Sequence, residues 1–107
     1  MTKTYETTAR ISACELTLEA GESTVFNDFA AASPAAVSVH PGAGASALVE
    51  LSTSLPSRVA AGTARWLPAG VGANGVVSAP EGLVLDAPLT ALRITASVGP
   101  VAVEVVQ

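Results

Sequence analysis

The sequence predicts an all-β protein, a small antiparallel β-sandwich or barrel that is jelly-roll-like and has about seven or eight short strands. Two observations predict this class. Hydrophobic and polar side chains alternate with a period of two along most of the chain, as they do in a strand that buries one face. Nine glycines and seven prolines interrupt this alternation, at the spacing of roughly 8–12 residues that is typical of turns in sandwiches and barrels.

Valine and leucine, rather than aromatic residues, have to form the hydrophobic core. The chain contains 14 Val and 10 Leu, whereas aromatic residues make up 4% of it. Valine and threonine are stiff at χ1 and favour the pleated surface of a sheet. A helix is poorly supported, because the alanines at 30–32 are followed at once by Ser33 and Pro34, and proline interrupts a helix.

The chain is expected to form one domain, which is the usual count at a length of 107 residues. Residues 1–8 are polar and rich in threonine, and we expect them to form a flexible N-terminal arm. The single β-sandwich domain then comprises residues 9–107, and no linker or internal repeat divides it.

Eight segments carry the strand pattern. The last two are joined by a turn at residues 98–100 and are predicted to form a terminal hairpin with one buried face, which includes Ile94. Arg93 and Glu104 would then pair across the exposed face of this hairpin. In chain order, the eight segments are residues 11–18, 23–29, 36–40, 47–53, 59–67, 83–85, 89–97 and 101–106.

Charge and hydropathy exclude several classes of function. The net charge is −4 and the chain has five Lys and Arg residues, so it lacks the basic stripe that nucleic-acid binding requires. No apolar run approaches the ~20 residues that span a bilayer. The start of the chain lacks the apolar core of a signal peptide, so we expect synthesis in the cytoplasm. The single cysteine cannot form an internal disulfide, which agrees with a reducing compartment.

Cys14 and His40 are the residues from which a nucleophilic or metal site could be built. His40, the only histidine, lies at the end of a predicted strand, and we expect it to be an ordinary, partly exposed side chain. Cys14 shares a strand face with Leu16 and Leu18, which predicts a small buried hydrophobe. The spacings of a metal site are missing, so neither a metal nor another cofactor is predicted. A small hydrolase that uses Cys14 with His40 remains an alternative.

Residues 70–75 match the pattern Gly-x-Gly-x-x-Gly letter for letter. This pattern binds phosphate only when a helix follows, because the helix N-terminus supplies the amides and the dipole. Residues 76–80 are instead strand-like and end at a proline, and no lysine lies nearby. We therefore interpret residues 70–75 as a flexible loop.

The carboxylates are scattered along the chain, and several lie in predicted turns, where they would keep a small sandwich soluble. A pair of acid and base residues from distant strands stays open as an alternative. No segment has the alternating acidic residues and the glycine of a calcium loop. The carboxylates expected in turns are Glu19, Glu22, Glu81 and Asp86.

Trp66 is the only tryptophan and is placed near the end of the predicted strand 59–67, next to Arg65. A lone tryptophan in a small β-domain most often packs in the core or at a subunit interface, with its N–H bonded to a backbone acceptor. A surface on which Trp66 stacks against a sugar is the other interpretation. Both faces of some strands are apolar, for example at Leu48-Val49 and Val105-Val106, which indicates that another subunit covers part of the surface.

Residues 87–96 read Ala-Pro-Leu-Thr-Ala-Leu-Arg-Ile-Thr-Ala, and Gly99 and a valine-rich segment that ends in Gln107 follow. Upstream, residues 65–70 read Arg-Trp-Leu-Pro-Ala-Gly. These segments, which lie in the C-terminal two-fifths of the chain, resemble the closing strands and the tryptophan-containing strand of small all-β virion proteins of tailed bacteriophages. The resemblance implies a head decoration or cement protein, or another small head or tail component.

The resemblance also implies what such a protein does and where it is found. It would be a non-enzymatic structural protein on the capsid surface of the virion, where it binds the major capsid protein and stabilises the head. It would form a homo-oligomer, a trimer or a dimer, and would bind neither nucleic acid nor a membrane. A carbohydrate-binding module or a head or tail fibre module that uses the Trp66 region is the alternative.

Overall fold

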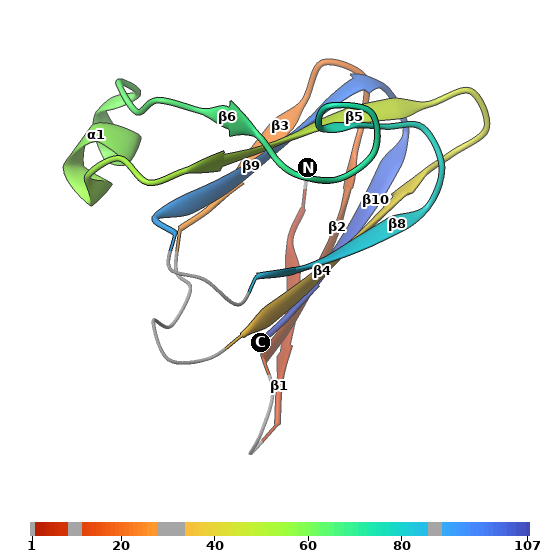
Figure 1. Ribbon diagram of the computed structural model, residues 1–107. Helices are drawn as coiled ribbons and strands as arrows, with labels where there is room; N and C mark the ends of the chain where they lie inside the picture. The colour runs from red at the N-terminus through yellow and green to blue at the C-terminus, as the bar shows by residue number, and fades with distance from the viewer. Residues whose placement is uncertain (1, 9–11, 28–33, 86–88) are drawn as a thin grey trace.

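The computed structural model describes residues 2–8, 12–27, 34–85 and 89–107. Two antiparallel sheets lie face to face in it (Figure 1), so the prediction of an all-β sandwich is confirmed. The elements are β1 (Thr4–Thr7), β2 (Ser12–Leu18), β3 (Ser23–Phe26), β4 (Ala35–Pro41), β5 (Ser46–Ser52), α1 (Pro56–Ala61), β6 (Leu67–Pro68), β7 (Val76–Val77), β8 (Glu81–Leu85), β9 (Ala91–Val98) and β10 (Val101–Val106). Sheet A has the order β1-β2-β10-β4-β8, and sheet B has the order β3-β9-β5-β6, with β7 also paired to β5.

The pairing of the strands follows a simple rule. β2 pairs with β10, β3 with β9, β4 with β8 and β5 with β7, all antiparallel. These eight strands therefore form one long hairpin, and its successive pairs lie alternately in sheet A and sheet B. The pairing of β10 with β4 joins the two strand pairs of sheet A, and the pairing of β9 with β5 joins those of sheet B. The fold is a jelly roll. β1 extends sheet A beyond β2.

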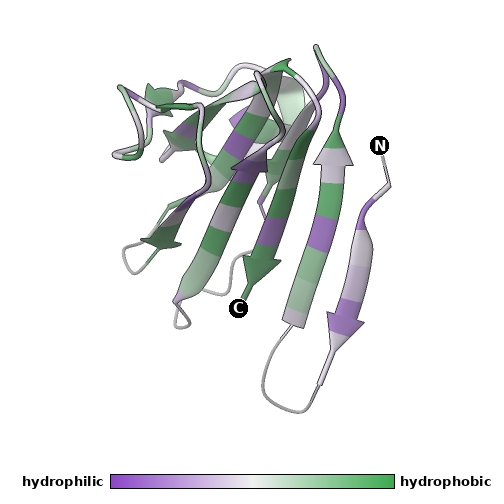
Figure 2. Ribbon diagram, turned by 90° about the vertical axis from the view of Figure 1, so that its right-hand side faces the viewer, coloured by the Kyte–Doolittle hydropathy of each residue, from purple (hydrophilic) through white to green (hydrophobic). Residues whose placement is uncertain are grey.

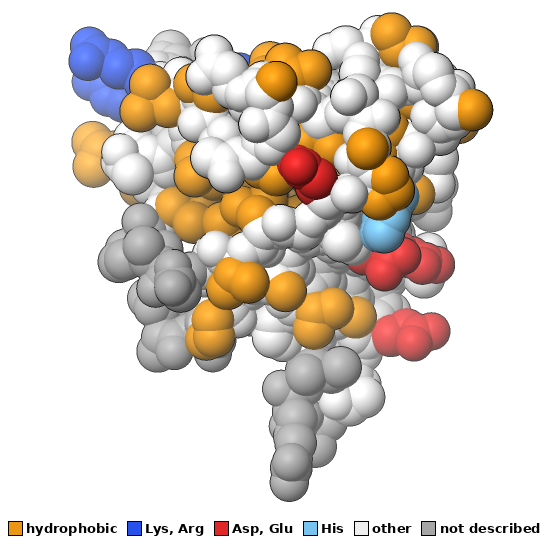
Figure 3. Space-filling view, turned by 45° about the vertical axis from the view of Figure 1, so that its right-hand side comes forward, with side chains coloured by type: hydrophobic (Ala, Val, Ile, Leu, Met, Phe, Trp, Pro, Cys, Tyr) orange, Lys and Arg blue, Asp and Glu red, His pale blue; other side chains and the backbone are white. Residues whose placement is uncertain are grey.

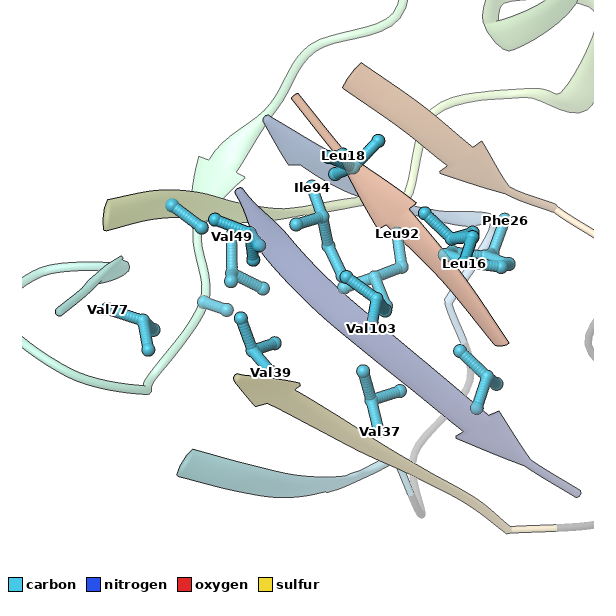
Figure 4. Packing of buried hydrophobic residues seen from close by; sticks show 14 of the residues in the cluster. Leu16, Leu18, Phe26, Val37, Val39, Val49, Val77, Leu92, Ile94 and Val103 are labelled. Atoms are coloured by element: carbon cyan, nitrogen blue, oxygen red, sulfur yellow. The ribbon is translucent and has the colours of Figure 1, made fainter. Parts of the chain in front are cut away.

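Alternating residues of both sheets meet in one hydrophobic core (Figure 4). Leu18, Val39 and Val103 from sheet A and Val49 and Ile94 from sheet B are fully buried. Burying each such side chain contributes about 1.5–3 kcal/mol. Figure 2 shows the corresponding alternation of hydrophobic and hydrophilic residues along the strands of sheet A. The core is built mainly from valine and leucine, as the composition predicts.

The predicted terminal hairpin is wrong. β9 and β10 follow one another in the chain, but β9 lies between β3 and β5 in sheet B, whereas β10 lies between β2 and β4 in sheet A. The connection at Gly99-Pro100 thus crosses from one sheet to the other, and a Cβ atom on Gly99 would lie 2.5 Å from the backbone nitrogen of Ala20. Arg93 consequently pairs with Glu50, while Glu104 is the Cα partner of Glu15. Alternation identifies the buried face of a strand, but it does not identify the neighbouring strand.

The predicted strand at residues 59–67 is also wrong. Residues 56–61 form the short helix α1, which begins with Pro56 in its first turn and ends at Gly62 with φ 76°. Proline is favoured at the first helical position, and glycine is favoured in the left-handed position after the last one. The amide of Thr63 donates a hydrogen bond of 2.9 Å to the carbonyl of Arg58 and closes the helix. Of the predicted strand 59–67, only Leu67 lies in a strand, β6.

The described residues contain ten strands, more than the seven or eight expected. β6 and β7 have two residues each, which is too short for a period of two to be visible. β1 falls within the segment 1–8 that was assigned to an arm, and all four of its residues are exposed, so it has no hydrophobic alternation. Residues 11, 28 and 29 of the predicted strands lie outside the described residues, and residues 89–90 precede β9.

Candidate functional site

Cys14 and His40 do not form a pair. Cys14 is 8% exposed and is part of the hydrophobic core, whereas His40 is exposed. Both residues lie in sheet A, but β10 separates their strands, and their side chains lie on opposite faces of this sheet. Ordinary strand spacings place their Cα atoms about 14 Å apart. A nucleophile and its base have to be within hydrogen-bond reach, so the hydrolase alternative loses its catalytic pair.

The surroundings of each residue agree with an ordinary structural role. His40 Nε2 lies 3.0 Å from Ser38 Oγ, two residues earlier on the same strand. Within the described residues, no group of three or more His, Cys, Asp or Glu side chains is placed to hold a metal ion.

The carboxylate of Glu22 accepts a hydrogen bond of 2.8 Å from the backbone amide of Glu19, and this bond lowers the pKa of Glu22. It belongs to the turn between β2 and β3.

The glycines of the segment 70–75 have structural reasons of their own. Gly72 and Gly75 have φ values of +60° and +86°, which glycine adopts without a steric cost. A Cβ atom on Gly75 would lie 2.8 Å from the carbonyl oxygen of Val49. The same glycine accepts a hydrogen bond of 2.8 Å from the amide of Val49. A two-residue strand, β7, follows the segment and no helix does, so the glycine pattern serves a tight loop packed on β5.

Trp66 lies on the outer side of sheet B rather than in the core. The guanidinium of Arg93 lies 4.4 Å from the centroid of its ring, within the range of a cation–π contact. The same guanidinium donates two hydrogen bonds to Glu50 Oε1, from Nε at 3.0 Å and from Nη2 at 2.8 Å. Glu50 and Arg93 are Cα partners on β5 and β9, and Trp66 precedes β6. We call these three residues the Trp66 stack.

The sequence did not predict the Trp66 stack, because it paired Arg93 with Glu104. The signal that could have found it is weak. Glu50 and Arg93 both occupy the outward positions of their predicted strands, but only the pairing of β5 with β9 shows that they are neighbours. One face of the indole ring is in contact with Arg93, which leaves less of the ring for a sugar than a fully exposed tryptophan would offer.

Replacing Arg93 by methionine is expected to lower the free energy of unfolding by about 1–2 kcal/mol. The side chain of Glu50 is 15% exposed, so the variant leaves a largely buried carboxylate without its cation. The matched control is Arg65→Met, because Arg65 is exposed and its change should alter stability by less than about 0.5 kcal/mol. Urea unfolding followed by Trp66 fluorescence measures both variants. Equal effects of the two changes would show that the Trp66 stack adds no stability.

The outer face of sheet A, the side turned away from sheet B, carries an acidic pair that sequence reasoning also missed. Glu15 and Glu104 are Cα partners on β2 and β10, and both are exposed. Like charges directly opposite one another are unfavourable in a sheet. Neither carboxylate forms an ion pair with a described residue. Figure 3 shows acidic side chains and the single histidine gathered at one side of the molecule.

A shallow hollow lies beside this pair. It has a volume of about 380 Å³ and is open to solvent, and its lining includes Thr2, Thr4 and Thr17 as well as the two carboxylates. Its walls are the backbones and side chains of β1, β2 and β10. A hollow of this shape offers hydrogen-bonding groups but encloses no ligand, so it has the character of a contact surface rather than of a catalytic pocket.

Large hydrophobic side chains are exposed at several separate places on the surface. They come from both sheets and from the helical connection. Their exposed fractions are Tyr5 56%, Leu55 64%, Leu67 72%, Val76 45%, Val84 66%, Val98 50% and Val106 39%. Single exposed hydrophobes are normal on a protein surface. Those that continue one another across a sheet mark an interaction surface.

Comparisons with protein families, with curated proteins and with solved structures find no match to this chain. Among the described residues, no helix has the length and apolar character needed to cross a membrane.

Proposed function

We propose that this protein is a non-enzymatic structural protein of a virion, a capsid decoration protein that binds the major capsid protein on the outer coat lattice and stabilises the head. The observation that carries the proposal is the set of exposed hydrophobic side chains on both sheets. A small jelly roll that leaves such side chains in solvent has surface to bury on partners. The resemblance of the C-terminal segments to phage virion proteins supplies the identity of the partner.

The arrangement of the reactive side chains also supports a structural role. Cys14 is buried and His40 lies on the opposite face of the sheet, so the pair that would favour an enzyme is separated. The jelly roll occurs in viral capsid proteins as well as in lectins. Because one fold serves many functions, the fold by itself favours neither role.

Co-sedimentation tests this proposal. The purified chain is mixed with capsids assembled from the coat protein of the same genome, and bound protein is separated by centrifugation. We expect saturable binding and a higher temperature of capsid disruption. The single variants Leu67→Asp and Val84→Asp, each at an exposed position, would show which sheet carries the contact, with Thr53→Asp as a polar exposed control. A chain that stays entirely in the supernatant contradicts the proposal.

The alternative, a carbohydrate-binding or fibre module that uses Trp66, has one observation in its favour. Trp66 lies on the outer side of sheet B beside Arg93 and is partly exposed. Against it, the guanidinium of Arg93 occupies one face of the ring. Trp66 is the only tryptophan, so its fluorescence reports directly on this site. If the emission of Trp66 changes with no glycan of a panel, this result contradicts the carbohydrate-binding alternative.

A further inference from the structure

The strand β8 forms one edge of sheet A. It pairs with β4 on one side, and no described strand pairs with its other side. Figure 2 shows sheet A with β8 at one edge and β1 at the other, and no described strand lies beside the outer side of β8. The free edge of a strand presents a row of unpaired N–H and C=O groups, which is a template for a further strand.

The other edges of the two sheets carry features that oppose further pairing. β1 has a charged residue, Glu6, among four exposed positions. At the edge strand β3, the ammonium of Lys3 lies 3.4 Å from the carbonyl oxygen of Val25. The edge strands β6 and β7 have two residues each, and β6 contains Pro68. Short strands, charges and prolines are the usual means by which proteins block their edges.

β8 carries fewer of these features. Its sequence is Glu-Gly-Leu-Val-Leu, and its five residues pair with β4 in one continuous register. It contains neither lysine nor proline, and its one charge lies at its first residue. The side chain of Val84 is 66% exposed. An apolar edge strand that is regular and uncharged in its middle is expected to be covered in the working form of a protein.

The apolar character of β8 continues across the outer face of sheet A. Val84 is the Cα partner of Ala36, Ala36 is the partner of Val106, and Val106 is the partner of Ala13. These four residues lie in one row across four strands, with Val106 39% exposed. Figure 3 shows hydrophobic side chains in the lower half of the molecule, and acidic side chains lie beside them at the right-hand side.

We propose that β8 pairs antiparallel with β8 of a second copy of this chain, about a two-fold axis at Leu83, so that sheet A continues from one copy into the other. A two-fold contact requires a surface that is complementary to itself. In this register Leu83 lies opposite Leu83 of the second copy, and Gly82, which has no side chain, leaves room for Val84 of the second copy. The two Glu81 carboxylates lie at opposite ends of the paired strands, so no like charges meet.

The size of the contact predicts its strength. A pair of five-residue strands with one adjoining row of side chains buries less than the roughly 1,000 Å² that a specific, stable interface needs. The association is therefore expected to be weak and to depend on concentration. The proposal does not depend on the capsid function, because it follows from the edge of the sheet alone.

Sedimentation equilibrium of the purified chain tests this dimer. The mass is expected to rise from 10.6 kDa towards twice this value as the concentration increases from about 5 µM to 1 mM. Val84→Lys, which places a charge on the free edge, is expected to weaken association at least tenfold. The matched control is Val98→Lys, because Val98 is 50% exposed and lies at the end of β9, which belongs to sheet B and not to sheet A. Circular dichroism verifies that both variants are folded.

Hydrogen exchange of the unaltered chain gives a second, independent readout. The amides of residues 81–85 are expected to exchange more slowly at 1 mM than at 5 µM, whereas those of β1 should not change. The proposal would be overturned by a monomer at 1 mM, by a dimer that Val84→Lys does not weaken, or by concentration-dependent protection confined to another edge. Protection of residues 81–85 only when the coat protein is added would assign the edge to that partner instead, and it too would overturn pairing between copies.

Discussion

Replacing Ile94 by aspartate is expected to abolish folding. Ile94 is fully buried in the middle of β9, where it meets residues of sheet A in the core. At this position the carboxyl group would be either buried with its charge unpaired or neutralised and left without hydrogen-bond partners, and in both cases the apolar packing of Ile94 is lost from a core whose domain is typically stable by about 5–15 kcal/mol. The variant should therefore show an unfolded circular dichroism spectrum and narrow amide chemical-shift dispersion.

The neighbouring position provides the control. Thr95 is only partly buried and lies on the outer face of sheet B, so Thr95→Asp is expected to fold and to lose no more than about 1 kcal/mol. The two changes introduce the same charge one residue apart. The reverse result, in which Ile94→Asp folds and Thr95→Asp does not, would show that the strand is shifted by one residue, since such a shift exchanges the two faces.

The second large effect is expected at Gly72. In Gly72→Ala, the new Cβ atom would overlap the carbonyl oxygen of Val76, and φ is +60°. Because this oxygen accepts a hydrogen bond from the amide of Ala73, the loop cannot move aside without losing that bond. We expect a loss of about 3 kcal/mol or more in the free energy of unfolding, measured by urea denaturation.

Gly44→Ala is the matched control for this change. Gly44 has a similar φ of +73°, but no atom lies within 4 Å of the position of a Cβ atom. The left-handed backbone alone costs an alanine roughly 1–2 kcal/mol. The difference between the two variants in the free energy of unfolding therefore measures the steric overlap. Equal losses of this free energy would show that the segment 70–75 accommodates a side chain without steric overlap.

The sequence was sufficient for the fold class and for most strand positions, because both depend on local alternation. Residues 12–18 and 101–106 illustrate this, since their inward and outward side chains follow the predicted pattern. Strand pairing was not accessible in the same way. A short turn between two alternating strands predicts a hairpin, but the same pattern fits a connection between two sheets, as at Gly99.

The helix α1 was missed although a signal for it was present. Pro56 and Gly62 are placed as the first helical residue and the left-handed residue after a short helix. Val59 has a strong preference for strands, and this favoured the wrong interpretation. No residue of α1 is buried, so the helix has no hydrophobic stripe that would reveal its period.

The positions of Cys14 and His40 could be predicted individually, as a buried and an exposed residue, because each depends on its own strand. The Trp66 stack and the acidic pair could not be predicted, because each combines residues from strands that are distant in the sequence. Glu50 and Arg93 are 43 residues apart. Only the pairing of strands brings such residues together, and alternation does not encode it.

The place of β10 has a consequence for biosynthesis. β10 is the last strand of the chain, yet it lies in the middle of sheet A, between β2 and β4. Until residues 101–106 have left the ribosome, β2 and β4 have no neighbour on their inner edges, and the two halves of sheet A remain apart. Folding is therefore expected to begin only after translation of β10, with slow kinetics that reflect contacts between distant residues. During this interval the exposed strands of the nascent chain are candidates for chaperone binding.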